Sequence, residues 1–384
     1  MRATLLPYGR QTIDTRDVQA VVDVLRSDWL TTGPNVASFE EVFARRVSAR
    51  HAVAVSNGTA ALHAAAFAAG LRPGDEAIVP TLTFAASANC VRYLGADVVF
   101  VDVRPKTLTI DPAAVEGAIT PRTRAIVSVD FAGIPADFAE LEQVAARHGL
   151  MLIDDAAHAL GAVYRGRSLG SIAPLTTFSL HPVKHVTTGE GGMVTTDDEV
   201  IADALRRFRN HGIVSDHRQR EKAGSWFYEM VDLGFNYRLT DFQCVLGISQ
   251  LGRLDERLAR RRAIAARYQA AFATRDELEL PATLDDREHA WHLYTVRLRL
   301  DRLRIGRAEV FRALRAENIG VNVHYIPVPW HPYYQQLGYR RGQWPVSEDA
   351  YERLLSLPMW SGMTDADVED VIVALDRVLD WARL

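Results

Sequence analysis

The chain has 384 residues, of which 48% are hydrophobic and 24% are charged, as in a globular protein large enough for two domains. Its formal net charge of -4 argues against a general nucleic-acid binder. The two cysteines, Cys90 and Cys244, lie in apolar helical contexts, which gives no basis for a disulfide framework or a cysteine-based metal site.

The N-terminal sequence, MRATLLPYGRQTID, lacks the apolar run of a signal peptide. No stretch of the chain approaches the roughly 20 consecutive apolar residues that a membrane span needs. We therefore expect a cytoplasmic protein without a membrane partner.

The first two predicted elements are helices. Val18, Val21, Val22 and Leu25 recur at helical spacing over 15–27, and a second helix follows Gly33-Pro34. From there, short apolar segments alternate with amphipathic ones, and the predicted strands are 51–56, 76–80, 97–102, 124–130, 150–155, 176–180 and 192–196. This alternation predicts an α/β fold with a mostly parallel central sheet and helices on both faces.

The pattern changes near residue 240. A long helical stretch rich in Arg and Leu (241–275) leads to the extended run WHLYTVRLRL, a helix near 307–317 and an amphipathic helix from Thr364. We expect a large α/β domain over 1–250, with an N-terminal arm at 1–14, and a smaller α+β domain over 251–384.

Ligands of such sheets bind beyond the carboxyl ends of the strands, so the residues that follow the strands are the first candidates for a site. The first strand ends in small and hydroxyl residues, Ser56 to Ala60, which enter a helix. Backbone N–H groups at a helix N-terminus favour an anion such as a phosphate. An ordinary Ser/Thr cap with a glycine turn is the alternative interpretation.

The strand 150–155 ends in Asp154 and Asp155, and His158 follows three residues later. These side chains could bind a metal, act as an acid–base pair, or hold a protonated ring nitrogen of a cofactor. A purely structural role, with an aspartate capping the next turn, is also open.

Lysine is rare in this chain, since only Lys106, Lys184 and Lys222 occur among the 44 basic residues. Lys184 follows the strand 176–180, among small and apolar neighbours and just before the glycine-rich loop TTGEGG. A lysine that loses its hydration there becomes an amine nucleophile toward a carbonyl. Ser179 offers a hydroxyl to a phosphate nearby. An exposed surface lysine is the general alternative.

Together these features match the needs of pyridoxal 5'-phosphate (PLP). This cofactor requires a lysine for covalent attachment, an acid opposite its ring nitrogen, donors for its phosphate and a group over its ring. Phe84, which follows the strand 76–80, could supply the stacking group.

Segments from end to end of the chain resemble the DegT/DnrJ/EryC1/StrS family of PLP-dependent sugar aminotransferases. They are SNGTAAL (56–62), PTLTFAASAN (80–89), IDDAAHALGA (153–162), FSLHPVKHVTTGEGGMVTT (178–196), RNHGI (209–213), GFNYRLTDFQCVLGISQL (234–251) and NVHYIPV (322–328). The resemblance implies a type I aminotransferase fold and a homodimer with active sites shared between the subunits.

The resemblance also implies roles for single residues. Lys184 matches the lysine that binds the cofactor, Asp155 the acid at the ring nitrogen, and His158 a contact to the ring hydroxyl at a position that is often Gln. Phe84 falls at the ring-stacking position, and Asn236 matches a phosphate contact donated by the partner subunit. The remaining expected cofactor contacts are Gly58, Thr59, Ala60 and Ser179.

The segments PYGRQTID, LRSDWLTTGP and HPVKHVTTGEGGM are most similar to the pseudaminic-acid branch of the family. That likeness implies a UDP-linked keto sugar as acceptor, L-glutamate as donor and UDP-4-amino-4,6-dideoxy-N-acetyl-β-L-altrosamine as product. Leu180, where the branch usually has an aromatic residue, and Pro329-Trp330 depart from its pattern near the expected sugar pocket. Candidate substrate contacts, for each of which structural hydrogen bonding is the alternative, are Tyr8, His185, Arg238, His324 and Tyr325.

Three other functions remain to be weighed. A metal-dependent hydrolase would use Asp154, Asp155 and His158 but leaves Lys184 unexplained. A non-catalytic regulatory protein could share the same fold. A sibling aminotransferase could make perosamine or 4-amino-arabinose instead.

Overall fold

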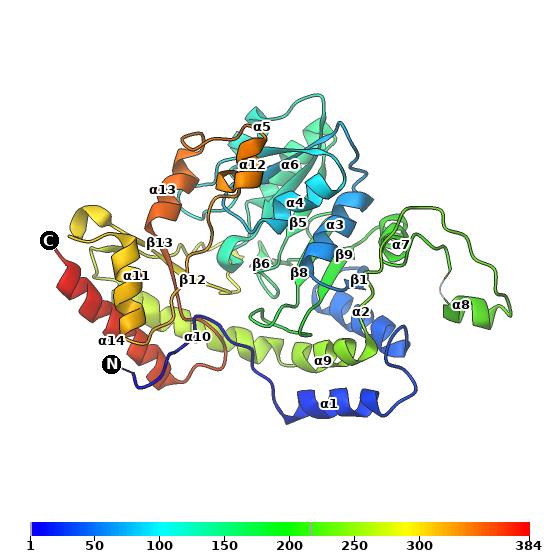
Figure 1. Ribbon diagram of the computed structural model, residues 1–384, viewed down its shortest axis with the longest axis horizontal. Coiled ribbons are helices and arrows are strands. Elements are labelled where there is room, and N and C mark those ends of the chain that lie inside the picture. The colour runs from blue at the N-terminus through cyan, green and yellow to red at the C-terminus, as the bar shows by residue number, and fades with distance from the viewer. Residues whose placement is uncertain (1, 216) are drawn as a thin grey trace.

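The computed structural model describes residues 2–215 and 217–384, and its centre is a seven-stranded sheet (Figure 1). The strand order is β1-β9-β8-β5-β4-β2-β3, and β9 runs antiparallel to both of its neighbours while the other pairs are parallel. The predicted mostly parallel sheet is therefore confirmed. Its strands are β1 (His51–Val55), β2 (Glu76–Pro80), β3 (Asp97–Val101), β4 (Thr123–Val129), β5 (Met151–Asp155), β8 (Leu175–Ser179) and β9 (Gly192–Thr196).

Helices cover both faces of this sheet because successive strand residues point to opposite sides. In β1, Ala52 and Ala54 join a core that includes residues of α2, α6 and α9. Val53 and Val55 join a second core that includes residues of α3, α4 and α7. The helices of these layers are α2 (Pro34–Arg46), α3 (Gly58–Ala68), α4 (Ala86–Tyr93), α5 (Pro112–Gly117), α6 (Phe138–His148), α7 (Glu199–Phe208) and α9 (Asp241–Leu251).

The C-terminal part builds a third core around a three-stranded sheet of order β10-β12-β13. This sheet packs with long helices, whose apolar stripes supply most of that core. The elements of this core are α10 (Leu254–Phe272), β10 (Leu278–Glu279), β12 (Tyr294–Leu298), α11 (Arg307–Ala316), β13 (Leu354–Leu357) and α14 (Asp365–Ala382). Two further helices of the C-terminal part, α12 (Pro332–Gln336) and α13 (Pro345–Arg353), place Tyr334 in the second core and Ala350 in a small fourth one.

The N-terminal segment lies beside this C-terminal part (Figure 1). Leu6 is buried in the third core, its N–H donates to Asn318 O at 2.9 Å, and its carbonyl accepts from Gly320 N at 2.7 Å. Met359 N donates to Tyr8 O at 3.0 Å. These bonds hold the segment around Tyr8 against the C-terminal part, before α1 (Thr15–Leu25) begins.

The predicted helix over 241–275 is wrong in one respect. The structure divides it into α9 and α10 at Gly252 and Arg253, because the backbone of Arg253 leaves the helical region (φ -117°, ψ 14°). The pattern also missed α7, α12 and α13, the short helix α8 (His217–Lys222), and a small sheet of order β11-β6-β7 built from Arg287–Glu288, Val163–Tyr164 and Arg167–Ser168. Among the described residues, no helix is long and apolar enough to cross a membrane.

Candidate active site

A cavity of about 750 Å³ opens beyond the carboxyl ends of β5 and β8. The N-terminus of α3 forms one wall, and Tyr8 and the segment 322–325 form another. The predicted site residues that line this cavity are Tyr8, Gly58, Thr59, Ala60, Phe84, Asp155, His158, Ser179, Lys184, His324 and Tyr325. Residues from far-apart parts of the chain thus meet where a parallel sheet is expected to bind ligands.

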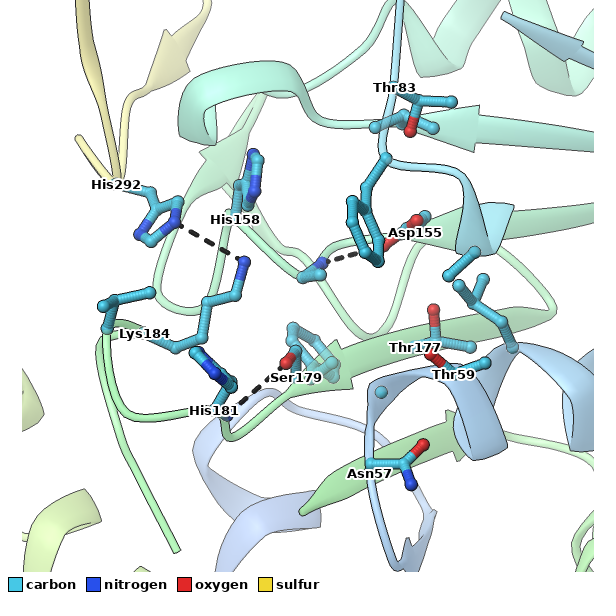
Figure 2. A pocket seen from close by; sticks show the side chains of 18 of the residues that line it. Asn57, Thr59, Thr83, Asp155, His158, Thr177, Ser179, His181, Lys184 and His292 are labelled. Carbon is cyan, nitrogen blue, oxygen red and sulfur yellow. Dashed lines mark hydrogen bonds between the residues drawn. The ribbon is translucent and has the colours of Figure 1, made fainter. Parts of the chain in front are cut away.

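The N-terminus of α3 provides an anion site in this cavity. Asn57 caps the helix by accepting from Ala60 N at 2.8 Å, and the hydroxyls of Thr59 and Ser179 line the same end (Figure 2). Gly58 is required there, because a Cβ on it would lie 2.9 Å from Ser179 Cβ. Free N–H groups, a helix dipole and two hydroxyls together suit a phosphate group.

Asp155 ends β5 and lies in the cavity floor, with 6% of its surface exposed. Ser87 Oγ donates to its Oδ2 at 2.6 Å, and Ala157 N donates to its Oδ1 at 3.2 Å. Burial raises the pKa of the carboxyl, and these two bonds and the charge of Lys184 oppose that rise. The chain thus directs donors at a carboxylate that has little contact with water.

Asp154 points to the opposite face of β5, as the pleat of a strand requires. Its Oδ1 accepts from Ser128 Oγ at 3.2 Å, and its pKa is raised by burial and by the neighbouring Asp130. Asp154, Asp155 and His158 therefore do not converge, and no group of metal-ligating side chains occurs among the described residues. The geometry removes the metal-site hypothesis that the sequence had left open.

Lys184 lies in the turn after β8, and its side chain reaches into the cavity (Figure 2). Burial lowers the pKa of its ammonium group to about 8; the Asp155 carboxylate opposes this shift and the Arg261 guanidinium adds to it. More of the amine is therefore unprotonated near neutral pH than in an exposed lysine. This state is the one that attacks a carbonyl.

His292 is a site residue that sequence reasoning missed. Its Nε2 lies 3.5 Å from Lys184 Nζ, and its ring packs against His158 with centroids 4.4 Å apart (Figure 2). It belongs to the run WHLYTV just before β12, which the pattern identified only as an extended segment. Its contact with Lys184, 108 residues away, has no signal in local sequence.

His158 is 6% exposed and its Nε2 lies 3.0 Å from Tyr325 Oη. Burial, together with the charge of Lys184, lowers its pKa well below the usual range, so the ring is neutral. Its Nδ1 is buried and has no hydrogen-bond partner among the described residues. A buried polar atom without a partner, on a cavity wall, is suited to a polar group of a ligand.

Three predicted residues lie elsewhere. His185 does not line the cavity, because its side chain points away from the cavity that Lys184 enters. It is 2% exposed, and its Nε2 lies 2.8 Å from Ala290 O. Arg238 lines a separate pocket and donates to Asn210 Oδ1 at 2.7 Å. Asn236 is exposed at the surface and also lies outside the cavity of its own chain.

The residues present fit pyridoxal phosphate. The α3 N-terminus suits its phosphate, the Asp155 carboxylate its ring nitrogen, and the unpartnered Nδ1 of His158 a polar ring substituent. Phe84, whose ring centroid is 5.9 Å from that of Tyr325, offers an aromatic face on the cavity wall. Lys184 supplies the amine, so each functional group of the cofactor has a complementary group in this chain.

Comparisons with known proteins agree with this geometry. Residues 11–376 match the DegT/DnrJ/EryC1/StrS aminotransferase family. The chain is 44% identical to the spore coat polysaccharide biosynthesis protein SpsC of Bacillus subtilis over 99% of both chains.

Solved structures resemble it over nearly their whole length. One is Spr1654 of Streptococcus pneumoniae, which is assigned as a sugar aminotransferase and was solved in PLP- and PMP-forms. Its PMP-form has a TM-score of 0.93 and 32% sequence identity to this chain, and the match covers 98% of this chain and 99% of that one. PseC of Helicobacter pylori, an aminotransferase involved in the biosynthesis of pseudoaminic acid, has a TM-score of 0.92, 28% identity and coverage of 98% and 100%. This protein therefore belongs to the DegT/DnrJ/EryC1/StrS family and is a sugar aminotransferase with the type I fold and pyridoxal phosphate as its cofactor.

Proposed function

We propose that this enzyme moves the amino group of L-glutamate to C4 of a UDP-linked 4-keto-6-deoxy-N-acetyl hexose in the cytoplasm, as a step of pseudaminic acid biosynthesis. The whole-chain likeness to PseC is the observation that carries this choice of sugar. Tyr8, which belongs to the opening segment PYGRQTID, lies in the cavity beside His324, with ring centroids 5.4 Å apart. This placement supports a role of that segment in the sugar pocket.

When bound, pyridoxal phosphate supplies a ring that withdraws electrons and so stabilises negative charge on the carbon next to the transferred nitrogen. Lys184 would hold the cofactor covalently through Nζ and, when free, would serve as the base that moves a proton to and from that carbon. Asp155 holds the proton on the ring nitrogen, and the α3 N-terminus with Thr59 and Ser179 orients the phosphate. His158 and Tyr325 form the wall beside Lys184 and exclude water from it.

We further propose a homodimer in which Asn236 reaches the cavity of the partner subunit. The segments 213–215 and 217–235 belong to an arm that projects from one side of the molecule (Figure 1). It exposes a run of large apolar side chains, among them Trp226 at 85%, Met230 at 65% and Leu233 at 78%. Such a run is unusual on a monomer and is typical of an interface, and Asn236 and Arg238 follow it directly.

A substrate panel tests the proposed sugar. The purified enzyme, loaded with cofactor and supplied with glutamate, is offered UDP-linked 4-keto-6-deoxy-N-acetyl hexoses and the keto sugars that precede perosamine and 4-amino-arabinose. We expect the UDP-linked N-acetyl hexose to give the highest kcat/KM, with 2-oxoglutarate formed in equal amount. A higher kcat/KM for another keto sugar would refute the pseudaminic assignment but leave the aminotransfer reaction in place.

The likeness to SpsC favours one alternative, a sibling nucleotide-sugar aminotransferase that serves polysaccharide biosynthesis. The same panel distinguishes it, because the preferred keto sugar would differ in its nucleotide or in its ring substituents. The hypothesis of a non-catalytic regulatory protein is disfavoured by Lys184, whose side chain lines the cavity with a lowered pKa.

A further inference from the structure

A buried chain of hydroxyl groups leads to the Asp155 carboxylate from the side away from Lys184. Ser87, in the first turn of α4, is fully buried and donates to Asp155 Oδ2 at 2.6 Å. Thr83, which is 2% exposed, lies with its Oγ1 2.7 Å from Ser87 Oγ. Neither residue was singled out by the sequence patterns as a site residue.

The direction of these hydrogen bonds follows from the number of hydrogens. Ser87 has a single hydroxyl hydrogen, and a carboxylate can only accept, so that hydrogen goes to Asp155. Thr83 must then donate its own hydrogen to Ser87. The distance of 2.6 Å is typical of a charge-assisted O–H···O⁻ bond, and a second hydroxyl behind the first polarises and strengthens it.

We propose that Ser87, fixed by Thr83, is a positioning residue that holds the Asp155 carboxylate in one orientation toward the cavity. A carboxylate that has little contact with water needs hydrogen-bond donors on its oxygens. Without them, rotation of the carboxylate group would exchange the oxygen that faces the ligand. Ala157 N donates to the other carboxylate oxygen, Oδ1, at 3.2 Å. Ser87 and Ala157 together therefore fix both oxygens.

The charged and titratable groups around Asp155 come from every neighbouring element. Lys184 approaches from the turn after β8, Cys90 from α4, Asp154 and Asp130 from β5 and the end of β4, and Tyr325 from the cavity wall. Of these, only Lys184 carries a charge opposite to that of Asp155. Ser87 adds a neutral donor to this carboxylate.

The chain offers a closely matched control. Ser128 is also fully buried, and its Oγ donates to Asp154, the neighbour of Asp155 on the opposite face of the same strand. Ser128→Ala removes the same atom, a buried serine hydroxyl that lies 3.2 Å from Asp154 Oδ1 and 3.4 Å from Ile153 O, but next to a carboxylate that does not line the cavity. A loss of activity that reflects only general destabilisation of the protein should therefore occur in both Ser87→Ala and Ser128→Ala.

This inference rests on the proposed function, and the experiment separates the two. In the cofactor-loaded enzyme we expect Ser87→Ala to lower kcat by about ten- to a hundred-fold while KM for glutamate changes little, because a hydrogen bond to a charged group is lost. In the apo-protein we expect its Kd for pyridoxal phosphate to rise by about ten-fold. Ser128→Ala should keep both values of the parent enzyme.

A pair of variants at Thr83 tests the second hydroxyl. Thr83→Val keeps the shape of the side chain but removes the hydroxyl donor, and we expect it to lose part of the kcat that Ser87→Ala loses. Thr83→Ser keeps the hydroxyl and should have the kcat of the parent enzyme. Equal kcat and cofactor Kd in Ser87→Ala and Ser128→Ala would overturn the inference. If the parent protein itself fails to bind pyridoxal phosphate, the proposed function fails instead.

Discussion

Lys184→Ala is expected to lower turnover by more than about 10⁴-fold, because it removes both the attachment point of the cofactor and the base that moves the proton. The protein should remain folded, since the Lys184 side chain is half-buried and its amine makes a long contact of 3.5 Å to His292 Nε2. Steady-state formation of 2-oxoglutarate from glutamate and keto sugar measures the loss. Thermal unfolding of the same samples verifies the fold.

Two further lysine variants sharpen this result. Lys184→Arg keeps a positive charge but cannot lose a proton near neutral pH, so it should be as inactive as Lys184→Ala. Lys222→Ala, at an exposed lysine far along the chain, should retain full turnover. Substantial turnover in Lys184→Ala would mean that another group performs the chemistry.

Asp155→Asn is expected to cost roughly 3–5 kcal/mol of transition-state stabilisation, as when one partner of a buried charge pair is removed. That figure corresponds to a loss in kcat of about two to four orders of magnitude. The amide keeps nearly the same volume and can still accept from Ser87, so the cavity floor should keep its shape. The measurement is kcat and KM with glutamate as donor.

Asp154→Asn provides the matched control for this variant. Asp154 is equally buried and adjacent in the chain, but it points to the other face of β5 and bonds Ser128. Its neutralisation should leave turnover near that of the parent enzyme. If Asp154→Asn were as impaired as Asp155→Asn, the loss would reflect damage to β5 rather than a role at the ring nitrogen.

The central sheet could be predicted because its strands are short, almost wholly apolar and separated by amphipathic helices, a pattern that local sequence carries. Each predicted strand from 51–56 to 192–196 lies within one or two residues of the observed one. The two-residue strands such as β6 and β11 are too short to show a period, and their pairing is set by contacts between distant segments. The division into domains at residue 250 stays a prediction.

The site likewise contains residues that local sequence predicts and residues that only tertiary contacts place there. Lys184 and Asp155 stand directly after or at the end of strands, so the rule for parallel sheets placed them at one edge. His292 and Ser87 reach the site only through tertiary contacts. His185 was a predicted substrate contact, but successive residues in a turn point in different directions. The structure directs His185 to Ala290 O and brings His292 to the amine of Lys184 instead.

The absorbance spectrum of the purified protein, before and after addition of glutamate, tests the central claim most directly. With pyridoxal phosphate bound covalently to Lys184, we predict a visible band that glutamate converts to the spectrum of the pyridoxamine form, and no such band in Lys184→Ala. A protein that develops no band even with added pyridoxal phosphate, or a band that survives in Lys184→Ala and ignores glutamate, would contradict the account.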